Sequence, residues 1–198
     1  MSVLPFKSRI TGLVLAGGRG MRMKGRDKGL QCFNGVPLVQ HLINRLAPQC
    51  ASVLISANRN LVKYRALAAT VYPDLRTGFC GPLAGIETGL SHCPTDWLMV
   101  VPCDAPTLPL DIASRLFSAT FSSNLRRQAV FATTAEQPYP TICLLHRSLR
   151  PSLSKFLDEK QRRVMLWLLA IEAQAVLFEN NDAFSNFNTM DSLKQHAS

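Results

Sequence analysis

Short apolar segments of strand length alternate with helix-patterned segments along this chain. The strand-like runs are residues 10–16, 52–57, 70–72 and 97–101, and the helix-like segments are 37–48, 60–68, 82–92 and 110–121. Such alternation implies parallel βαβ units whose helices cover both faces of one sheet. We therefore predict an α/β fold: a three-layer α/β/α sandwich around a mostly parallel, Rossmann-like sheet that binds ligands at the carboxyl ends of its strands.

The last third of the chain continues this pattern with less regularity. Strands are predicted at residues 129–132, 141–145 and 175–178, and helices at 148–157, 163–171 and from Asp191 onward. We find no internal repeat and no low-complexity linker. Because 198 residues suffice for one core but leave little room for two, we predict one domain over residues 1–198.

The segment after the first predicted strand is rich in glycine and positive charge. Residues 15–28 read LAGGRGMRMKGRDK, and three glycines in four positions allow backbone N–H groups to surround phosphate oxygens. Arg22 and Lys28 would neutralise a triphosphate. The segment is not a Walker loop, since Arg26-Asp27 follows where Lys and Ser or Thr are needed, and Met23 replaces the third glycine of G-x-G-x-x-G. The alternative is an ordinary βα loop.

Candidate polar residues follow the other predicted strands. A carboxylate at Asp104 could hold Mg²⁺, which keeps several waters and binds phosphate oxygens. Asp74 could accept hydrogen bonds from a base or ribose, and residues 81–85 (GPLAG) form a turn into a helix that a ligand can approach closely. The amides of Asn186 and Asn188 suit a polar heterocycle. Taken singly, each has an ordinary alternative as a turn or capping residue.

Composition narrows the classes of partner. The chain has 22 Lys and Arg against 13 Asp and Glu, a net charge of +9, and seven of these cations lie in residues 1–30 against one acid. This excess favours a phosphorylated small molecule, with a solvated basic surface as the alternative. We find no recognition motif for nucleic acid, no secretory signal and no apolar run of membrane-spanning length, so neither nucleic acid nor membrane is an expected partner.

The reactive side chains argue against covalent catalysis. Six cysteines occur without a C-x-x-C pair, which predicts free thiols in a reducing cytoplasm rather than a zinc site. The four histidines form no cluster, and no Ser-His-Asp or Cys-His arrangement is recognisable. We therefore expect direct in-line attack of a substrate phosphate on an α-phosphorus, a reaction that depends on positioning and charge neutralisation.

Five motifs together resemble the MobA family of molybdenum cofactor guanylyltransferases over essentially the whole chain. They are L-A-G-G-x-x-x-R-M…D-K-G-L at residues 15–30, G-P-L-A-G at 81–85, P-C-D at 102–104, R-R-V-M at 162–165 and D-A-F-x-N-x-N-T at 182–189. The first motif alone indicates only the wider glycine-rich nucleotidyltransferase superfamily. The resemblance implies a fold of the nucleotide-diphospho-sugar transferase type and transfer of GMP from GTP to molybdopterin, with release of pyrophosphate.

The resemblance also assigns roles to residues. Contacts to GTP are implied for Leu15, Ala16, Gly17, Gly18, Lys28, Ser56, Asp74 and Asp104. Catalytic roles are implied for Arg22, Lys28 and Asp104, with Mg²⁺ on Asp104. Contacts to the pterin substrate are implied for Gly81, Gly85, Arg162, Arg163, Asn186 and Asn188. A cytoplasmic monomer is expected, with other molybdenum cofactor biosynthesis proteins and molybdoenzyme chaperones as protein partners.

Two positions depart from the family pattern, and other functions stay open. Ser56 stands where the family often has Asn, and Lys24 where glycine is common. A serine hydroxyl lacks the paired donor and acceptor of an amide. No residue pattern specifies guanine from first principles, so a cytidylyltransferase, or another NTP-using enzyme acting on molybdopterin or on a sugar or polyol phosphate, is the alternative. A non-catalytic nucleotide-binding or carrier protein is a second alternative.

Overall fold

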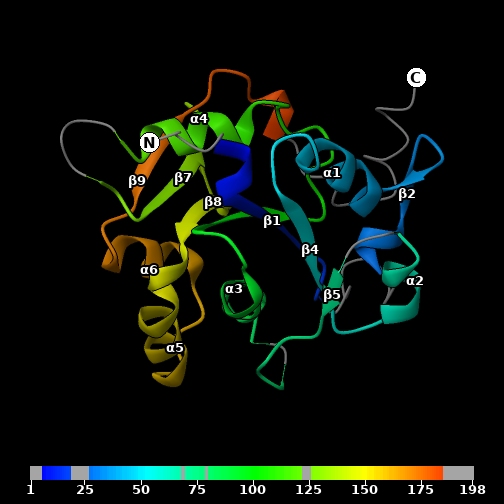
Figure 1. Cartoon of the computed structure of the whole chain (residues 1–198), viewed down its shortest axis with the longest axis horizontal. Helices are drawn as coiled ribbons and strands as arrows, with labels where there is room; N and C mark the ends of the chain where they lie inside the picture. The colour runs from blue at the N-terminus through cyan, green and yellow to red at the C-terminus, as the bar shows by residue number, and fades with distance from the viewer. Residues whose placement is uncertain (1–5, 19–26, 68–69, 79, 122–125, 185–198) are drawn as a thin grey trace.

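A mixed sheet of seven strands runs through the described part of the computed structural model, which covers residues 6–18, 27–67, 70–78, 80–121 and 126–184 (Figure 1). In spatial order, its strands are β5 (Thr70–Tyr72), β4 (Ser52–Ser56), β1 (Ile10–Leu15), β6 (Trp97–Pro102), β8 (Pro138–His146), β7 (Ala129–Thr133) and β9 (Gln174–Leu177). All neighbouring pairs are parallel except the two that involve β8. The predicted, mostly parallel sheet is therefore confirmed.

Helices cover both faces of this sheet. The helices are α1 (Leu38–Leu46), α2 (Leu61–Arg65), α3 (Pro82–His92), α4 (Ile112–Ala119), α5 (Arg150–Asp158) and α6 (Val164–Ala170). In Figure 1, α1 and α4 lie on one side of the sheet and α3, α5 and α6 on the other. The predicted three-layer α/β/α sandwich is confirmed.

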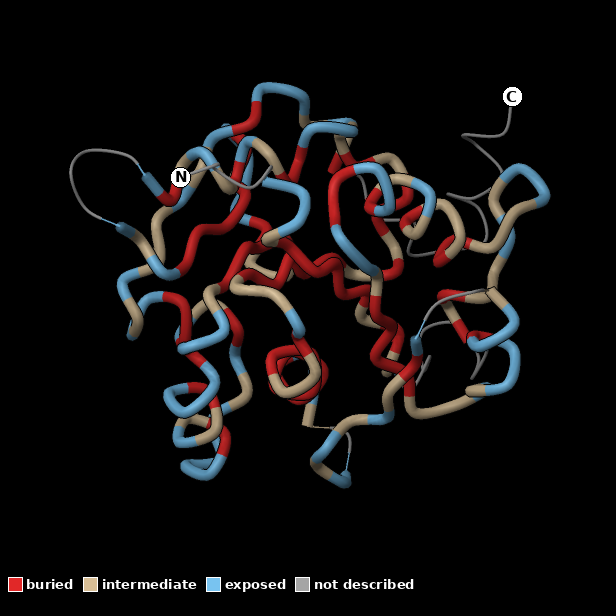
Figure 2. Tube along the Cα trace, in the orientation of Figure 1, coloured by how far each residue is buried: buried red, intermediate tan, exposed pale blue. Residues whose placement is uncertain are grey.

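Side chains of the central strands alternate between the two cores, as the two-residue period of a strand requires. Ile10 and Val14 of β1 face the core beneath α1 and α4, whereas Leu13 faces the core beneath α3 and α5. In β6, Met99 and Val101 join the first core, and Leu98 and Val100 join the second. Both faces of β1 and β6 are buried, which explains why these strands are mostly apolar along their length (Figure 2).

Some elements differ from the sequence predictions. The helix predicted at 60–68 is only Leu61–Arg65, because the chain must turn back to reach β5 at Thr70. A small hairpin of β2 (Cys32–Phe33) and β3 (Val36–Pro37) was not predicted. Its Asn34-Gly35 loop has positive φ at both residues (50° and 77°), as a type I′ turn requires. The helix predicted from Asp191 lies outside the described residues.

The connections place a topological switch point between β1 and β6. From β1 the chain passes through α1 to β4 on one side, whereas β6 lies on the other side of β1 and is reached through α3. Since α1 and α3 lie on opposite faces, the loops after β1 and β6 diverge and leave a crevice at the carboxyl ends of these strands. Among the described helices, none has both the length and the apolar character needed to cross a bilayer.

Candidate functional site

A cavity of about 510 Å³ lies at these carboxyl ends. It is lined by Leu15, Ala16, Gly17, Gly18, Lys28, Ser56, Asp74, Gly81, Pro82, Gly85, Pro102, Cys103, Asp104 and Thr141. The structure thus brings together all eight residues predicted to contact GTP and two of the predicted substrate contacts, Gly81 and Gly85. The volume is in the range of pockets that bind small molecules and cofactors.

A hydrogen-bonded triad fixes the carboxylate of Asp74 at one wall of the cavity. The hydroxyl of Ser56 donates to Asp74 Oδ1 at 2.7 Å, and Asn58 Nδ2 donates to Asp74 Oδ2 at 2.8 Å. The backbone N–H of Asp74 in turn donates to Asn58 Oδ1 at 2.9 Å. Asn58 also reaches across to the glycine loop, where its Nδ2 donates to the carbonyl of Gly17 at 3.4 Å. The sequence analysis did not assign Asn58 a role, although it follows β4 much as Gly17 follows β1.

An ion pair between Lys28 and Asp104 lies on the wall of the cavity. Lys28 Nζ lies 2.5 Å from Asp104 Oδ2, and both side chains are about four-fifths buried (22% and 18% exposed). Asp104 is held by a backbone continuation of the sheet, because the N–H of Cys103 donates to the carbonyl of Leu15 at 3.1 Å. The cavity therefore presents a cation and a carboxylate next to each other, the arrangement expected where phosphate and a metal ion meet.

The hydrogen bonds of Asp27, the residue before Lys28, hold this part of the chain in place. Asp27 is buried, and it accepts hydrogen bonds from Tyr64 (2.5 Å) and Asn60 (2.9 Å) at α2. Gly29 follows on the other side, and a Cβ there would lie only 2.6 Å from the Tyr64 hydroxyl. Burial and the hydrogen bond to Asp27 raise the pKa of Tyr64, so the phenol stays protonated as the donor. This anchor ties the end of the glycine-rich loop to the protein core.

Helix α3 begins at the cavity and packs very closely on the sheet. Gly81 caps it with φ of 80°, a left-handed value that suits glycine, and Pro82 occupies the first turn. A Cβ at Gly85 would lie 2.8 Å from both Leu15 Cδ2 and Ser56 Oγ. The N-terminus of α3 therefore points its partial positive charge toward the cavity, and Gly85 allows the helix to approach that closely.

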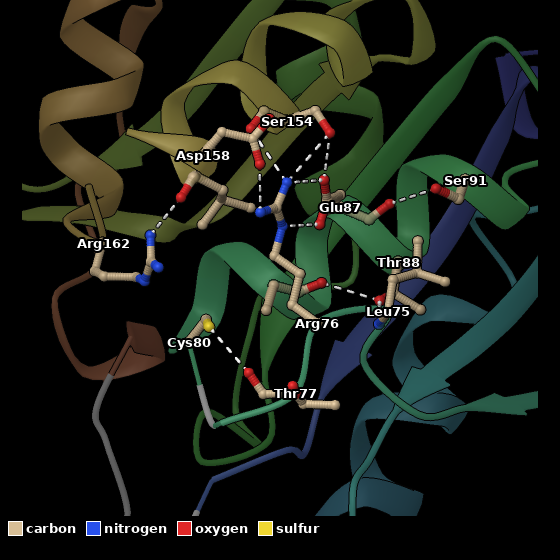
Figure 3. A network of polar contacts seen from close by, with 12 residues as sticks. Leu75, Arg76, Thr77, Cys80, Glu87, Thr88, Ser91, Ser154, Asp158 and Arg162 are labelled. Carbon is tan, nitrogen blue, oxygen red and sulfur yellow. Dashed lines mark hydrogen bonds and ion pairs between the residues drawn. The ribbon is translucent and has the colours of Figure 1, made fainter. Parts of the chain in front are cut away.

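A network of hydrogen bonds and ion pairs connects α3 to α5 (Figure 3). Arg76 forms a two-pronged ion pair with Glu87 (2.7 and 2.9 Å), donates to Asp158 at 2.7 Å and to the carbonyl of Ser154 at 3.2 Å. Glu87 is 4% exposed and also accepts from the Ser154 hydroxyl at 2.6 Å. Burial alone would raise the pKa of Glu87, but the hydrogen bonds from Arg76 and Ser154 outweigh it and lower that pKa. The segment between Asp74 and Gly81 is thus tied to both α3 and α5.

The remaining predicted residues lie elsewhere. Arg162 and Arg163 connect α5 to α6 and are not among the described residues that line the cavity; Arg162 donates to the carbonyls of Leu157 (2.8 Å) and Gln161 (2.7 Å). Arg22, Asn186 and Asn188 fall outside the described residues. Arg162 and Arg163 are therefore not part of the cavity wall, and their contacts to the pterin substrate stay a prediction.

One thiol, that of Cys103, lines the cavity. Cys103 is buried, and burial, with a smaller contribution from Asp104, raises its pKa to about 12. All six cysteines are free. Within the described residues, no three His, Cys, Asp or Glu side chains group closely enough to cage a metal ion. The donors present suit a cation held by one or two carboxylates together with phosphate oxygens.

Comparison with known proteins gives a consistent set of relatives. Residues 12–173 match the family model of the MobA-like NTP transferase domain. The chain is 42% identical over 191 residues to a molybdenum cofactor guanylyltransferase from Bordetella petrii, with 96% of this chain and 97% of the relative covered. It is 45% identical over 181 residues to the protein of the same name from Yersinia pseudotuberculosis, with 91% of each covered.

Solved structures agree on the fold. Molybdopterin-guanine dinucleotide biosynthesis protein A from Archaeoglobus fulgidus superposes with a TM-score of 0.75 at 20% identity, covering 93% of this chain and 95% of that one. A CMP:2-keto-3-deoxy-manno-octonic acid synthetase in complex with CTP gives 0.75 at 12% identity, with 96% and 97% covered. The predicted nucleotide-diphospho-sugar transferase type of fold is confirmed by these neighbours.

Proposed function

This chain belongs to the family of MobA-like NTP transferase domains, and we propose that it transfers GMP from GTP to molybdopterin, releasing pyrophosphate and forming the guanine dinucleotide form of the molybdenum cofactor. The observation that carries the proposal is the identity of 42% and 45% to guanylyltransferases of which it matches 97% and 91% of the length. The cavity supports it independently, because the Gly17 loop, Lys28, Asp74 and Asp104 converge there.

The cavity can align the reactants without a covalent intermediate. An oxygen of the acceptor phosphate attacks the α-phosphorus of GTP, and the bond from that phosphorus to the bridging oxygen of the β-phosphate breaks, so that pyrophosphate leaves with the electron pair. The attacking oxygen is already anionic, so no side chain has to remove a proton. We assign Lys28 and the N-terminus of α3 to neutralise phosphate charge, which leaves positioning as the main task of the protein.

Asp104 is the residue that would hold Mg²⁺. Its carboxylate lines the cavity beside Lys28, two residues after the end of β6, and phosphate oxygens and water would be the further ligands that Mg²⁺ ordinarily takes. When bound there, Mg²⁺ would neutralise charge that develops on the α-phosphate and the departing pyrophosphate. Asp74, held by Ser56 and Asn58, is placed to accept hydrogen bonds from the base or ribose of the nucleotide.

The test is Mg²⁺-dependent pyrophosphate release with molybdopterin and each of the four NTPs. We expect release with GTP only. Asp104→Asn should reduce the rate by at least about a hundredfold, which corresponds to roughly 2.7 kcal/mol of transition-state stabilisation. Asp111→Asn is the matched control, because Asp111 is exposed at the start of α4 and outside the cavity; its rate should equal that of the native protein.

Other outcomes would identify the alternatives. Release with CTP would keep the chemistry but make the protein a cytidylyltransferase. No release with any NTP, using molybdopterin that a known enzyme accepts, would favour a nucleotide-binding or carrier protein.

We also propose that the protein is a cytoplasmic monomer. It would receive molybdopterin from, and pass its product to, other molybdenum cofactor biosynthesis proteins and molybdoenzyme chaperones.

A further inference from the structure

A second, smaller cavity of about 150 Å³ lies at the amino ends of β1 and β6, away from the nucleotide cavity. Its walls are Arg9, Trp97, Thr120, Phe121, Arg126, Arg127, Gln128 and His146. Trp97 begins β6 and pairs with Ile10, whereas Pro102 at the other end of the same strand lines the large cavity. Five residue steps along a strand separate the two by about 17 Å. The small cavity is therefore a separate site.

Its polar groups are almost all hydrogen-bond donors or cations. Arg9 pairs with Asp96 at 3.2 Å, so its charge is largely balanced. Within the described part of the chain, neither Arg126 nor Arg127 forms an ion pair with a carboxylate. Burial lowers the pKa of His146, so its imidazole is neutral at pH 7. The uncompensated positive charge of the cavity thus comes from two arginines.

Two buried donors on these walls lack an acceptor. Trp97 is 6% exposed, and its indole Nε1 has no hydrogen-bond partner among the described residues; the same holds for Nε of Arg127. A buried donor without a partner is costly, and native proteins leave few of them. Both side chains line the cavity through other atoms, since these two nitrogens are themselves closed to solvent, so a ligand seated there would meet the charge of Arg126 and Arg127 rather than these two donors.

We propose that this cavity binds a small oxyanion, a phosphate or carboxylate group, at a site distinct from the nucleotide cavity. Its volume suits one such group with a short attached chain and is too small for a nucleotide. Guanidinium groups bind phosphate and carboxylate through two parallel hydrogen bonds, and the rings of Trp97 and Phe121 supply the apolar part of the wall. The proposal does not depend on the guanylyltransferase activity.

Tryptophan fluorescence gives a direct assay, because Trp97 and Trp167 are the two tryptophans of the chain. Trp167→Phe leaves Trp97 as the reporter, and calorimetry on the native protein serves as a second measurement. Sodium phosphate and sodium acetate are titrated separately, with sodium chloride at equal ionic strength as the screening control. Mg²⁺ and GTP at saturating concentration are present throughout, so that phosphate does not occupy the nucleotide cavity.

The expected result is a saturable change with at least one of the two anions and none with chloride. Saturation with phosphate alone identifies a phosphate ligand, and saturation with acetate identifies a carboxylate. Arg127→Gln and, separately, Arg126→Gln should weaken binding by at least about tenfold, whereas the exposed Arg147→Gln, which removes the same charge outside the cavity, should change it less than about twofold. The proposal is overturned if neither anion saturates, or if both lining variants bind as tightly as the native protein.

Discussion

Replacing Gly85 with alanine tests whether the close packing of α3 sets the geometry of the nucleotide cavity. The added methyl group would lie 2.8 Å from Leu15 Cδ2 and 2.8 Å from Ser56 Oγ. The leucine terminus can move aside, but the serine hydroxyl is fixed by its 2.7 Å hydrogen bond to Asp74 Oδ1. We therefore expect Gly85→Ala to displace Ser56 and release one oxygen of the Asp74 carboxylate.

The size of the effect follows from three contributions. Overpacking a tight site costs about 1–3 kcal/mol. Alanine in the interior of a helix recovers roughly 1 kcal/mol relative to glycine. The lost hydrogen bond to a charged carboxylate costs about 1.5–3 kcal/mol more. Gly85→Ala should thus lower the free energy of unfolding by roughly 1.5–5 kcal/mol, and loss of the Asp74 geometry should weaken GTP binding by about tenfold or more.

Gly89→Ala is the matched control. Gly89 lies one turn further along α3, and a methyl group there would lie 2.5 Å from Leu13 Cδ2 and 2.9 Å from Leu98 Cδ2. Both neighbours are buried in the core and neither belongs to the cavity lining. Urea unfolding and calorimetric titration with GTP are measured on both variants. Gly89→Ala should lose stability by overpacking alone while its folded fraction binds GTP with native affinity.

The reasoning is refuted if Gly85→Ala binds GTP as tightly as the native protein while being equally destabilised. That result would mean that Ser56 accommodates the methyl group and that its bond to Asp74 does not matter for the nucleotide. Equal losses of GTP affinity in both glycine variants would refute it differently, since the effect would then come from the general position of α3 rather than from Ser56.

Three further predictions concern charged groups. Lys28→Ala should weaken binding of GTP by at least about tenfold but leave guanosine binding unchanged, as calorimetry would show. Equal losses of affinity for GTP and guanosine would mean that Lys28 does not bind the phosphates. Tyr64→Phe removes a donor from buried Asp27, so chemical unfolding should show a loss of about 1–3 kcal/mol, and native stability would contradict the anchor. Glu87→Gln should lower stability at pH 7. The pKa of Glu87 is lowered in the folded protein, so its contribution to stability is present above the ordinary glutamate pKa of about 4.3 and is lost as the pH falls through the folded pKa. The difference in stability between Glu87→Gln and the native protein should therefore shrink in acid unfolding. A stability difference that does not depend on pH would exclude the Arg76 ion pair as its cause.

The sequence predicted the central architecture because the central strands carry two independent signals. In β1 and β6 both faces are buried, so each strand is mostly apolar along its length, and Gly17 and Asp104 lie two residues after their last residues. The β2–β3 hairpin was missed although Asn34-Gly35 is a strong turn signal, since the flanking strands have only two residues each. The antiparallel β8 depends on its pairing with β6 across the sheet, which no local pattern encodes.

The lining of the cavity was predictable to the extent that its residues follow strands directly. Leu15 ends β1, and Gly17, Asp74 and Asp104 lie two residues after the ends of β1, β5 and β6; parallel strands bring these carboxyl ends to one edge. Their supports were not predictable. Asp27 and Tyr64 are 37 positions apart, and Arg76 and Asp158 are 82 apart, so the contacts that position the site exist only after the chain has folded.

Ser56 illustrates the difference between occupying a site and acting in it. The resemblance suggests a direct contact of Ser56 with GTP, and its place on the cavity wall agrees with that prediction. Yet its single hydroxyl proton is donated to Asp74, so toward the nucleotide it can offer only the acceptor capacity of its oxygen. An asparagine at this position could hold Asp74 and still present a second polar atom. Discrimination between bases should therefore depend here more on the fixed Asp74 carboxylate than on Ser56, and Ser56→Ala should reduce the affinity for GTP through that carboxylate.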